Sequence, residues 1–347
     1  MSLEYLSNRM LPAIESELKR IVARLDTPRT RLFGEMLTYH MGWSGEGSGT
    51  EATGKRIRPL LVLLTCAASY RFSQKTEVEA ETWKRALPAA ACIELIHNFS
   101  LVHDDIQDGS DLRRGRLTVW KKWGMPQAVN LGDALFILAH MALLETQDTF
   151  PLEKVLQAGS IINEACLALS SGQFMDISYE KRTDLVAEDY WPMISGKTAA
   201  LLSACTQVGA FLGDSDEQTL ASYRCFGHYL GLAFQVQDDY LGIWGDSALT
   251  GKSSESDLVA GKKSLPVLYG LAKNETFAKR WAQGPIHSDE VGQLSEQLAI
   301  EGAKLYTQEA ADQMTDLALQ SLRAAEPQGE AGEALFELAR MLVSRKA

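Results

Sequence analysis

Hydrophobic residues recur along the chain at the spacing of α-helices. Leu95, Phe99, Val102 and Ile106 lie four, three and four residues apart, which places them on one face of a helix. A similar apolar stripe runs through residues 226–241. Runs of alternating β-branched residues, which would indicate strands, are nearly absent. The pattern therefore predicts an all-α fold.

One segment is apolar on almost every side. The stretch VNLGDALFILAHMALLETQ, residues 129–147, predicts a helix buried in the centre of a bundle. Two stretches rich in glycine and serine, residues 42–54 and 245–263, are expected to be flexible. Since no linker or change in composition divides the chain, we predict one domain over residues 1–347 with ten or more helices. Prolines lie where helices are expected to start, at Pro59, Pro88, Pro126, Pro151 and Pro266.

Charge and cysteine content exclude several classes of protein. The net charge of −11 argues against nucleic acid as a partner, because binding phosphate backbones requires a basic surface. The five cysteines are odd in number and form no CxxC pair, so we expect small buried thiols in a reducing compartment, with neither a disulfide framework nor a zinc site. The first residues lack the apolar core of a secretory signal, and no run approaches the roughly 18 apolar residues of a membrane span. We therefore expect a cytoplasmic protein without a transmembrane segment.

Two acidic groups follow apolar helical stretches. Asp104, Asp105 and Asp108 crowd three carboxylates into about one and a half helical turns, where like charges repel. Asp238 and Asp239 repeat the pattern far along the chain. The first group could be a solvated helix end or a cation site. If both groups line one cavity, their charge is tolerable only around metal ions, and carboxylate oxygens favour Mg²⁺.

Basic residues in glycine-marked segments complement these acids. Each alone would ordinarily be a solvated side chain, but together they suit the oxygens of a diphosphate held by metal ions. Two stretches, GTEATGKR and GDSALTGKS, come near a P-loop; both depart from the motif and neither follows a predicted strand, which argues against a nucleotide hydrolase. The basic residues are Lys55, Arg56, Arg58, Arg113, Arg114, Lys197, Lys252, Lys262 and Lys263.

Seven segments, in order between Gly54 and Pro266, resemble the trans-prenyltransferases, also called isoprenyl diphosphate synthases. They are GKRIRP, ELIHNFSLVHDDIQDGSDLRRG, GDALF, GQFMD, KTAALL, FQVQDDYLG and GKKSLP. The resemblance implies a single-domain isoprenoid synthase bundle around a deep central cavity, usually a homodimer. The implied reaction is magnesium-dependent head-to-tail condensation of isopentenyl diphosphate with an allylic diphosphate, without a protein general base.

The resemblance also implies a role for individual residues. Three Mg²⁺ ions, which Mn²⁺ can replace, would be bound by Asp104, Asp105, Asp108, Asp238 and Asp239. Isopentenyl diphosphate would be held by Lys55, Arg58, His97 and Arg114. The allylic diphosphate would be held by Arg113, Lys197, Lys252 and Lys262, with Thr198 and Gln235 facing the reacting carbons. Lys197, Thr198 and Gln235 would thus take part in catalysis.

Product length depends on Phe99 and Ser100, which stand five and four positions before the first aspartate. One small residue beside one aromatic residue favours a C20 product, geranylgeranyl diphosphate, and also allows C15, farnesyl diphosphate. Ideal helix geometry turns Phe99 away from the aspartates, so a neighbouring helix or a kink must bring it into the cavity; the alternative is core packing.

Two positions depart from the family pattern. Thr53 replaces a glycine, and Gly242 stands where many members have the last acid of the second group. Three other activities stay open: a class I terpene cyclase, a head-to-head condensing synthase and a non-catalytic partner subunit.

Overall fold

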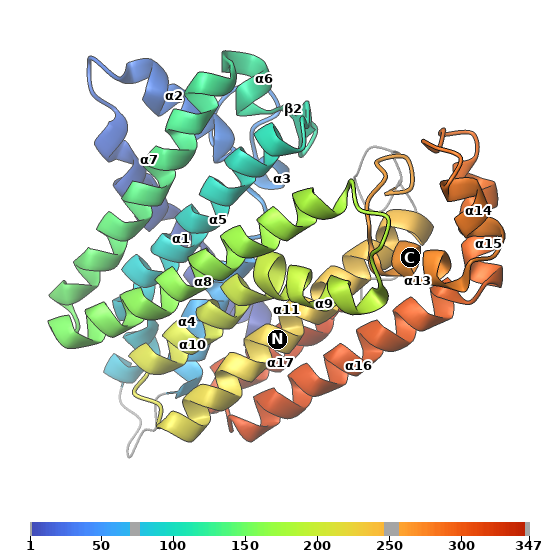
Figure 1. Cartoon of the computed structure of the whole chain (residues 1–347). Helices are drawn as coiled ribbons and strands as arrows, with labels where there is room; N and C mark the ends of the chain where they lie inside the picture. Colours follow the sequence, from blue (N-terminus) through green and yellow to red (C-terminus); the bar gives the residue numbers. More distant parts are fainter. Residues whose placement is uncertain (1, 70–76, 246–256, 344–347) are drawn as a thin grey trace. The chain divides into compact units, whose positions relative to one another are not determined.

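The computed structural model of the protein describes residues 2–69, 77–245 and 257–343 (Figure 1). Within these residues more than ten α-helices form, and the only strands are the two-residue pair β1 (Leu112–Arg113) and β2 (Arg116–Leu117). The predicted all-α fold is confirmed. The prolines named above lie at or next to the first turns of helices, as expected from the missing N–H of proline.

Contacts between Cα atoms divide the chain into two compact units. Unit 1 comprises Met1–Ile162, Cys205–Leu220 and Glu326–Leu335. Unit 2 comprises Asn163–Ala204, Ala221–Ala325 and Phe336–Ala347. Because the units interleave along the chain, they are not two successive sequence domains. The predicted single domain over residues 1–347 stays a prediction.

Unit 1 is built around two long helices, α5 and α7. Pro88 lies in the first turn of α5, and small Ala89, Ala90 and Ala91 follow it, fully or almost fully buried. Gly132 of α7 has no side chain because the His103 ring of α5 occupies that space. The helices of this unit are α1 (Ser2–Val22), α2 (Arg31–His40), α3 (Thr50–Thr53), α4 (Ile57–Ser69), α5 (Leu87–Gln107), α6 (Val119–Trp123) and α7 (Met125–Leu144), with 3₁₀ turns at Ala23–Leu25, Glu77–Ala86 and Glu145–Asp148.

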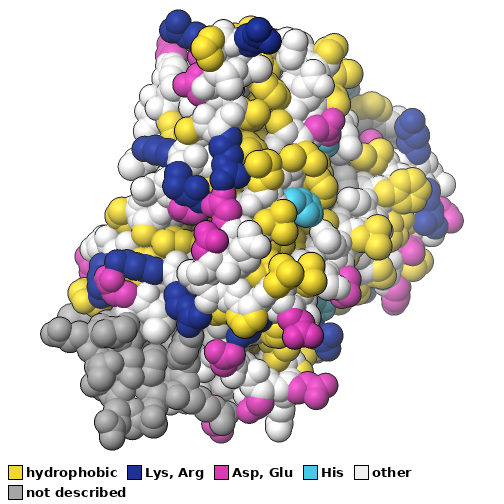
Figure 2. Space-filling view, turned by 90° about the vertical axis from the view of Figure 1, so that its left-hand side faces the viewer, with side chains coloured by type: hydrophobic (Ala, Val, Ile, Leu, Met, Phe, Trp, Pro, Cys, Tyr) yellow, Lys and Arg dark blue, Asp and Glu magenta, His cyan; other side chains and the backbone are white. Residues whose placement is uncertain are grey.

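Helix α7 corrects one prediction. Its Leu131, Leu135 and Leu138 are buried, but Ile137 is 58% exposed, and further apolar side chains of α7 are exposed at Met125, Val129, Met141 and Leu144. The helix therefore has one buried and one exposed apolar face, and is not buried all round. Figure 2 views the side of the molecule on which α7 lies in Figure 1, and shows hydrophobic side chains in patches among charged ones.

The same helix bears on the expected absence of a membrane span. Among the described residues one stretch, Met125–Asp148, is long and apolar enough to cross a membrane by length and composition, and 44% of its apolar window is buried. A single such helix is weak support for a span, because core helices have the same composition.

The glycine-rich stretch 42–54 is hydrogen-bonded to the hairpin that strands β1 and β2 form. The Arg116 side chain donates hydrogen bonds to three main-chain carbonyls, of Tyr39 (2.8 Å), Ser44 (2.6 Å) and Glu46 (3.0 Å). The Tyr39 hydroxyl donates in turn to the Leu117 carbonyl at 2.9 Å. Two residues of the stretch, Ser44 and Glu46, are thus bonded to Arg116, and the expected flexibility of the stretch stays a prediction.

Unit 2 packs its helices closely through small residues. A Cβ atom on Gly231 of α11 would lie 2.5 Å from Cα of Ala199, and one on Gly196 would lie 2.5 Å from the Ala168 carbonyl oxygen. Its helices are α9 (Ala187–Ile194), the π-helical turn η4 (Ser195–Ala199), α11 (Glu217–Trp244), α13 (Leu265–Lys273), α14 (Thr276–Trp281), α15 (Val291–Ile300) and α16 (Ala303–Ala324). Three helices have residues in both units: α8 (Leu152–Tyr179), α10 (Ala200–Leu212) and α17 (Gly329–Val343). The first residues of α11, up to Leu220, also belong to unit 1.

The predicted burial of the cysteines is confirmed for four of the five. All five are free thiols; Cys66, Cys92, Cys166 and Cys205 are buried and Cys225 is half-buried.

Candidate active site

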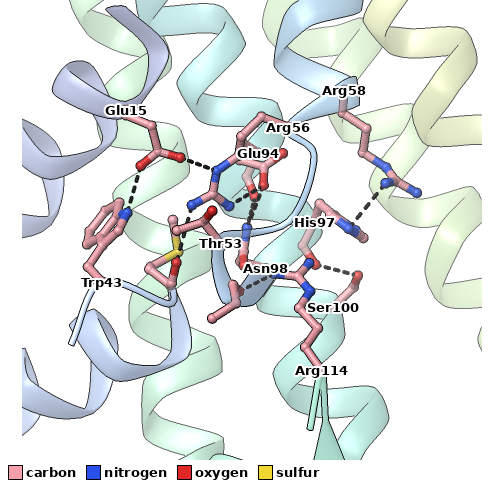
Figure 3. A network of polar contacts seen from close by, with 12 residues as sticks. Glu15, Trp43, Thr53, Arg56, Arg58, Glu94, His97, Asn98, Ser100 and Arg114 are labelled. Atoms are coloured by element: carbon pink, nitrogen blue, oxygen red, sulfur yellow. Dashed lines mark hydrogen bonds and ion pairs between the residues drawn. The ribbon is translucent and has the colours of Figure 1, made fainter. Parts of the chain in front are cut away.

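The segment between Gly54 and Arg58 is fixed by a buried ion network (Figure 3). Arg56 is 4% exposed, and its guanidinium donates to Glu15 at 2.6 Å and to Glu94 at 2.8 Å. Trp43 donates to the second oxygen of Glu15 at 2.6 Å. Arg56 adopts a left-handed φ of 48°, which this network holds in place. Its charge is thus fully matched by carboxylates.

Two residues further on, Arg58 has a different environment. Its Nη1 lies 3.1 Å from Nε2 of His97 on α5. Burial and the positive charge of Arg58 hold the pKa of His97 well below its usual range, so the neutral ring accepts the hydrogen bond. Across the residues that the structure describes, no carboxylate pairs with Arg58, and its Nε is buried without a hydrogen-bond partner.

Arg114 approaches the same segment from the hairpin. Its Nη1 donates to the Ala52 carbonyl at 2.8 Å, and a Cβ atom on Gly54 would lie 2.6 Å from its Nη2. Gly54 also has a φ of 76°, so both the backbone and the space require glycine there. Burial and the charge of Arg56 lower the pKa of Arg114.

The structure therefore brings together Arg58, His97 and Arg114, three of the four residues predicted to bind isopentenyl diphosphate. The fourth, Lys55, is exposed at the surface of the same segment. Two guanidinium groups without a matching carboxylate are an arrangement that favours an anion with several oxygens.

The first acidic group ends helix α5, and its members differ. Asp105 is 2% exposed; it accepts a hydrogen bond from Nε of Arg113 at 2.8 Å and forms an ion pair with Nη2 of Arg113 at 2.7 Å. Burial raises the pKa of Asp105, and the Arg113 charge opposes that rise. Asp104 is half-buried and Asp108, the C-cap residue, is exposed. Asp105 and Arg113 therefore support each other, while Asp104 and Asp108 have the more accessible carboxylates.

In unit 2 a chain of hydrogen bonds joins the other predicted residues. Thr198 donates to Gln235 at 2.7 Å, and Gln235 donates to Asp239 at 2.9 Å. Asp239 also accepts from the Tyr190 hydroxyl at 2.7 Å and from the Leu265 amide at 3.3 Å. Burial, followed by the charge of Asp257, raises the pKa of Asp239 to about 7. The carboxylate of Asp239 is thus occupied by donors, and that of Asp238 is half-buried beside it.

Two of the predicted basic residues of unit 2 pair with acids that the sequence analysis did not single out. Lys197, on the π-helical turn, pairs with Asp176 of the GQFMD segment. Lys262 lies 3.4 Å from Asp257. The GQFMD motif could have pointed to Asp176, but Tyr190 and Asp257 carry no sequence signal that distinguishes them from other residues. Lys252 lies outside the described residues.

The donor set of both acidic groups fits a hard divalent cation. The donors are carboxylate oxygens, without histidine or thiolate. In the described ranges no three His, Cys, Asp or Glu side chains lie together as a complete metal site.

Comparisons with known proteins identify the family of the chain. The profile of the polyprenyl synthetase family matches residues 48–298. A geranylgeranyl diphosphate synthase of Mycobacterium tuberculosis is 35% identical over 312 residues, which cover 88% of this chain and 84% of the relative. A (2E,6E)-farnesyl diphosphate synthase of Mycobacterium bovis is 39% identical over 271 residues, covering 78% and 70%.

Among solved structures, a polyprenyl synthetase from Streptomyces coelicolor A3(2) superimposes with a TM-score of 0.85 at 33% identity, covering 98% of this chain and 99% of the other. A geranylgeranyl pyrophosphate synthetase from Pyrococcus horikoshii also gives 0.85, at 31% identity and full coverage of both chains. With the ordered motifs, the all-α fold and these relatives in agreement, the chain belongs to the polyprenyl synthetase family and is a prenyltransferase.

Proposed function

We propose that this prenyltransferase condenses isopentenyl diphosphate head to tail with an allylic diphosphate in the presence of Mg²⁺. The observation that carries the proposal is the group of Arg58, His97 and Arg114, whose arginines have no matching carboxylate in the described structure. A terpene cyclase, which takes no isopentenyl diphosphate, has no use for such a second anion site. Both acidic groups are present, which argues against a non-catalytic subunit.

We assign binding and positioning roles to individual residues. Arg58, Arg114 and Lys55 bind the diphosphate of isopentenyl diphosphate, and neutral His97 orients Arg58. Asp104, Asp108 and Asp238 are the direct ligands for the divalent ions, while Asp105 and Asp239 hold their neighbours in position. Bound Mg²⁺, three ions per site with Mn²⁺ as a substitute, supplies positive charge to the departing diphosphate.

The chemistry needs no protein base. The allylic carbon–oxygen bond breaks to give diphosphate and an allylic carbocation, and Arg113, Lys197, Lys252 and Lys262 bind the diphosphate. The double bond of isopentenyl diphosphate then attacks the cation, while Thr198 and Gln235 face the reacting carbons. Finally a proton leaves the new chain for the released diphosphate. Preorganised charge of this kind usually supplies the largest part of a rate enhancement.

The product that the sequence favours is geranylgeranyl diphosphate, with farnesyl diphosphate as the alternative. The curated relatives include synthases of both names. We further propose a homodimer, for which the exposed apolar face of α7 is the support. From the sequence we also propose a cytoplasmic location.

One assay tests the function. The full-length protein is incubated with isopentenyl diphosphate, labelled dimethylallyl diphosphate and Mg²⁺, and the products are separated by chromatography. We expect labelled C20 diphosphate, and none after EDTA is added. In parallel, a bisphosphonate should raise Tm only when Mg²⁺ is present, because ligands stabilise the state that binds them. Cyclic hydrocarbons, head-to-head products or no product would contradict the proposal.

A further inference from the structure

The hairpin formed by β1 and β2 exposes apolar side chains and buries charged ones. Leu112 and Leu117 lie directly opposite each other across the two strands, and they are 56% and 45% exposed. Because opposite residues of an antiparallel pair point to the same face, the two leucines form one apolar face. The other cross-strand pair, Arg113 and Arg116, is half-buried on the opposite face. A small sheet ordinarily directs its apolar face inward, so this hairpin has the reverse arrangement.

The hairpin is rigid, so the leucines are not exposed by fraying. Its two turn residues, Arg114 and Gly115, have φ angles of 52° and 72°, the pattern of a type I′ turn. On the inner face Arg113 is bound to Asp105, and Arg116 donates to three main-chain carbonyls. A Cβ atom on Gly115 would meet no other described residue within 4 Å, so the turn projects into open space. The structure therefore holds both leucines at the surface.

The chain around these leucines is basic, although the protein as a whole is acidic. Residues 111–123, which include the hairpin and α6 (Figure 1), contain five basic residues and one acid, whereas the whole chain has a net charge of −11. Lys121 and Lys122 are exposed. The acid, Asp111, lies 3.0 Å from Nζ of Lys121. The segment that carries the leucines thus has an excess of positive charge.

Two tryptophans of α6 belong to the same segment. Nε1 of Trp120 donates to the Ser110 carbonyl at 2.8 Å, which ties α6 to the residues before the hairpin. Nζ of Lys121 lies 5.5 Å from the ring centroid of Trp120, and Nζ of Lys122 lies 4.6 Å from that of Trp123. Both indole rings are half-buried. Indole rings next to lysines are typical of protein surfaces at the boundary between water and lipid.

We propose that residues 111–123 form a docking surface for an anionic lipid bilayer. Leu112 and Leu117 enter the boundary between headgroups and acyl chains, while Lys121 and Lys122 contact lipid phosphates. The net negative charge of the chain does not prevent this contact, because charges more than about 8 Å apart are largely screened at physiological ionic strength. Lysines alone would also suit an acidic protein; the paired leucines and the indole rings favour the bilayer. The inference goes beyond the proposed function and does not depend on it.

The test measures how the full-length protein partitions onto lipid vesicles in the absence of substrates. Vesicles of phosphatidylglycerol and phosphatidylcholine are compared with vesicles of phosphatidylcholine alone, at low and high NaCl, by co-sedimentation. The variants are Leu112→Ser/Leu117→Ser and Lys121→Gln/Lys122→Gln. Leu305→Ser on α16, where the leucine is 62% exposed, is the matched control. Tm and light scattering record the stability and the mass of each variant.

We expect the wild type to bind the phosphatidylglycerol vesicles, and to bind them less at high NaCl. The leucine pair should lower the partition coefficient by about 10- to 100-fold, since two apolar side chains no longer enter the lipid. The lysine pair should lower it by about fivefold for each lysine and should reduce its dependence on salt. The control should match the wild type, and Tm should change little, because all four side chains are exposed.

A wild type that stays in solution with the phosphatidylglycerol vesicles, or a leucine variant that binds them like the wild type, would overturn the inference. A leucine variant of lower mass would show that a second copy of the chain covers the hairpin, which would also overturn it. Retention on immobilised polyglutamate as strong as on the vesicles, and unchanged by the leucine pair, would instead indicate an acidic protein partner. None of these results bears on the proposed reaction, which the assay with labelled substrate tests separately.

Discussion

At the scale of single residues, neighbours in sequence have opposite electrostatic roles. Arg56 and Arg58 look alike in GKRIRP, yet Arg56 pairs with Glu15 and Glu94, while the side chain of Arg58 is hydrogen-bonded to neutral His97. The motif predicted Arg58 as a binding residue from resemblance. The structural role of Arg56 could not be predicted, because its partners lie 41 and 38 residues away along the chain.

This contrast predicts that the same substitution lowers stability at Arg56 and weakens substrate binding at Arg58. Arg56→Met leaves Glu94 buried without its cation, so we expect the free energy of unfolding to fall by about 3–5 kcal/mol. Arg58→Met removes an unmatched charge, so stability should stay the same or rise while KM for isopentenyl diphosphate increases. Urea unfolding and steady-state kinetics measure the two effects, and each variant is the control for the other. Equal loss of stability in both would contradict the assignment.

At the scale of elements, the sequence predicted where helices lie better than it predicted which of their side chains are buried. The apolar stripe through Leu95 and Phe99 lies in α5 as expected. The apolar segment of α7 was predicted to be buried all round, but composition cannot separate a side chain in the core from one on an exposed apolar face. The partner of Phe99 could not be predicted either: its ring lies 5.0 Å from that of Phe136 on α7 and 5.0 Å from that of His103.

The packing of α5 against α7 bears on product length. If Phe99 limits the cavity, Phe99→Ala should give longer products than the wild type at similar total turnover, and Phe136→Ala should act in the same direction by releasing the Phe99 ring. Ser100, buried with its hydroxyl bonded to the His97 carbonyl, should shift products toward C15 when changed to Phe. Because Phe99 is only half-buried, its loss should cost less than the roughly 3–5 kcal/mol of a fully buried ring.

Chromatography of the labelled products of these three variants measures the effect. Unchanged product length in both folded Phe→Ala variants would leave Phe99 as ordinary packing between the helices.

At the scale of the whole molecule, the predicted residues are distributed over two units. The isopentenyl diphosphate group and the first acidic group lie in unit 1, and Lys197, Thr198, Gln235 and the second acidic group lie in unit 2. The resemblance of the motifs to the family predicted which residues belong to the isopentenyl diphosphate group and which to the acidic groups. It could not predict the pairing of Lys197 with Asp176 or of Tyr190 with Asp239, which depends on helices brought together only by folding.

The exposed face of α7 predicts the oligomeric state. Ile137→Glu places a charge in the middle of this apolar face and should convert a dimer to a monomer, because a buried unpaired charge is costly. Leu305→Glu on α16, where the leucine is 62% exposed, is a matched control and should leave the mass unchanged. Size-exclusion chromatography with light scattering measures the mass. A monomeric wild type, or a dimeric Ile137→Glu variant, would contradict the prediction.

The way Arg116 fastens the glycine-rich stretch has a consequence for how the sequence can vary over evolution. All three acceptors of its guanidinium are main-chain carbonyls, of Tyr39, Ser44 and Glu46. Main-chain acceptors survive almost any change of side chain. Drift at exposed Glu46 is therefore expected to be nearly neutral among descendants of this protein, while selection acts on a single distant arginine that keeps the stretch in its place.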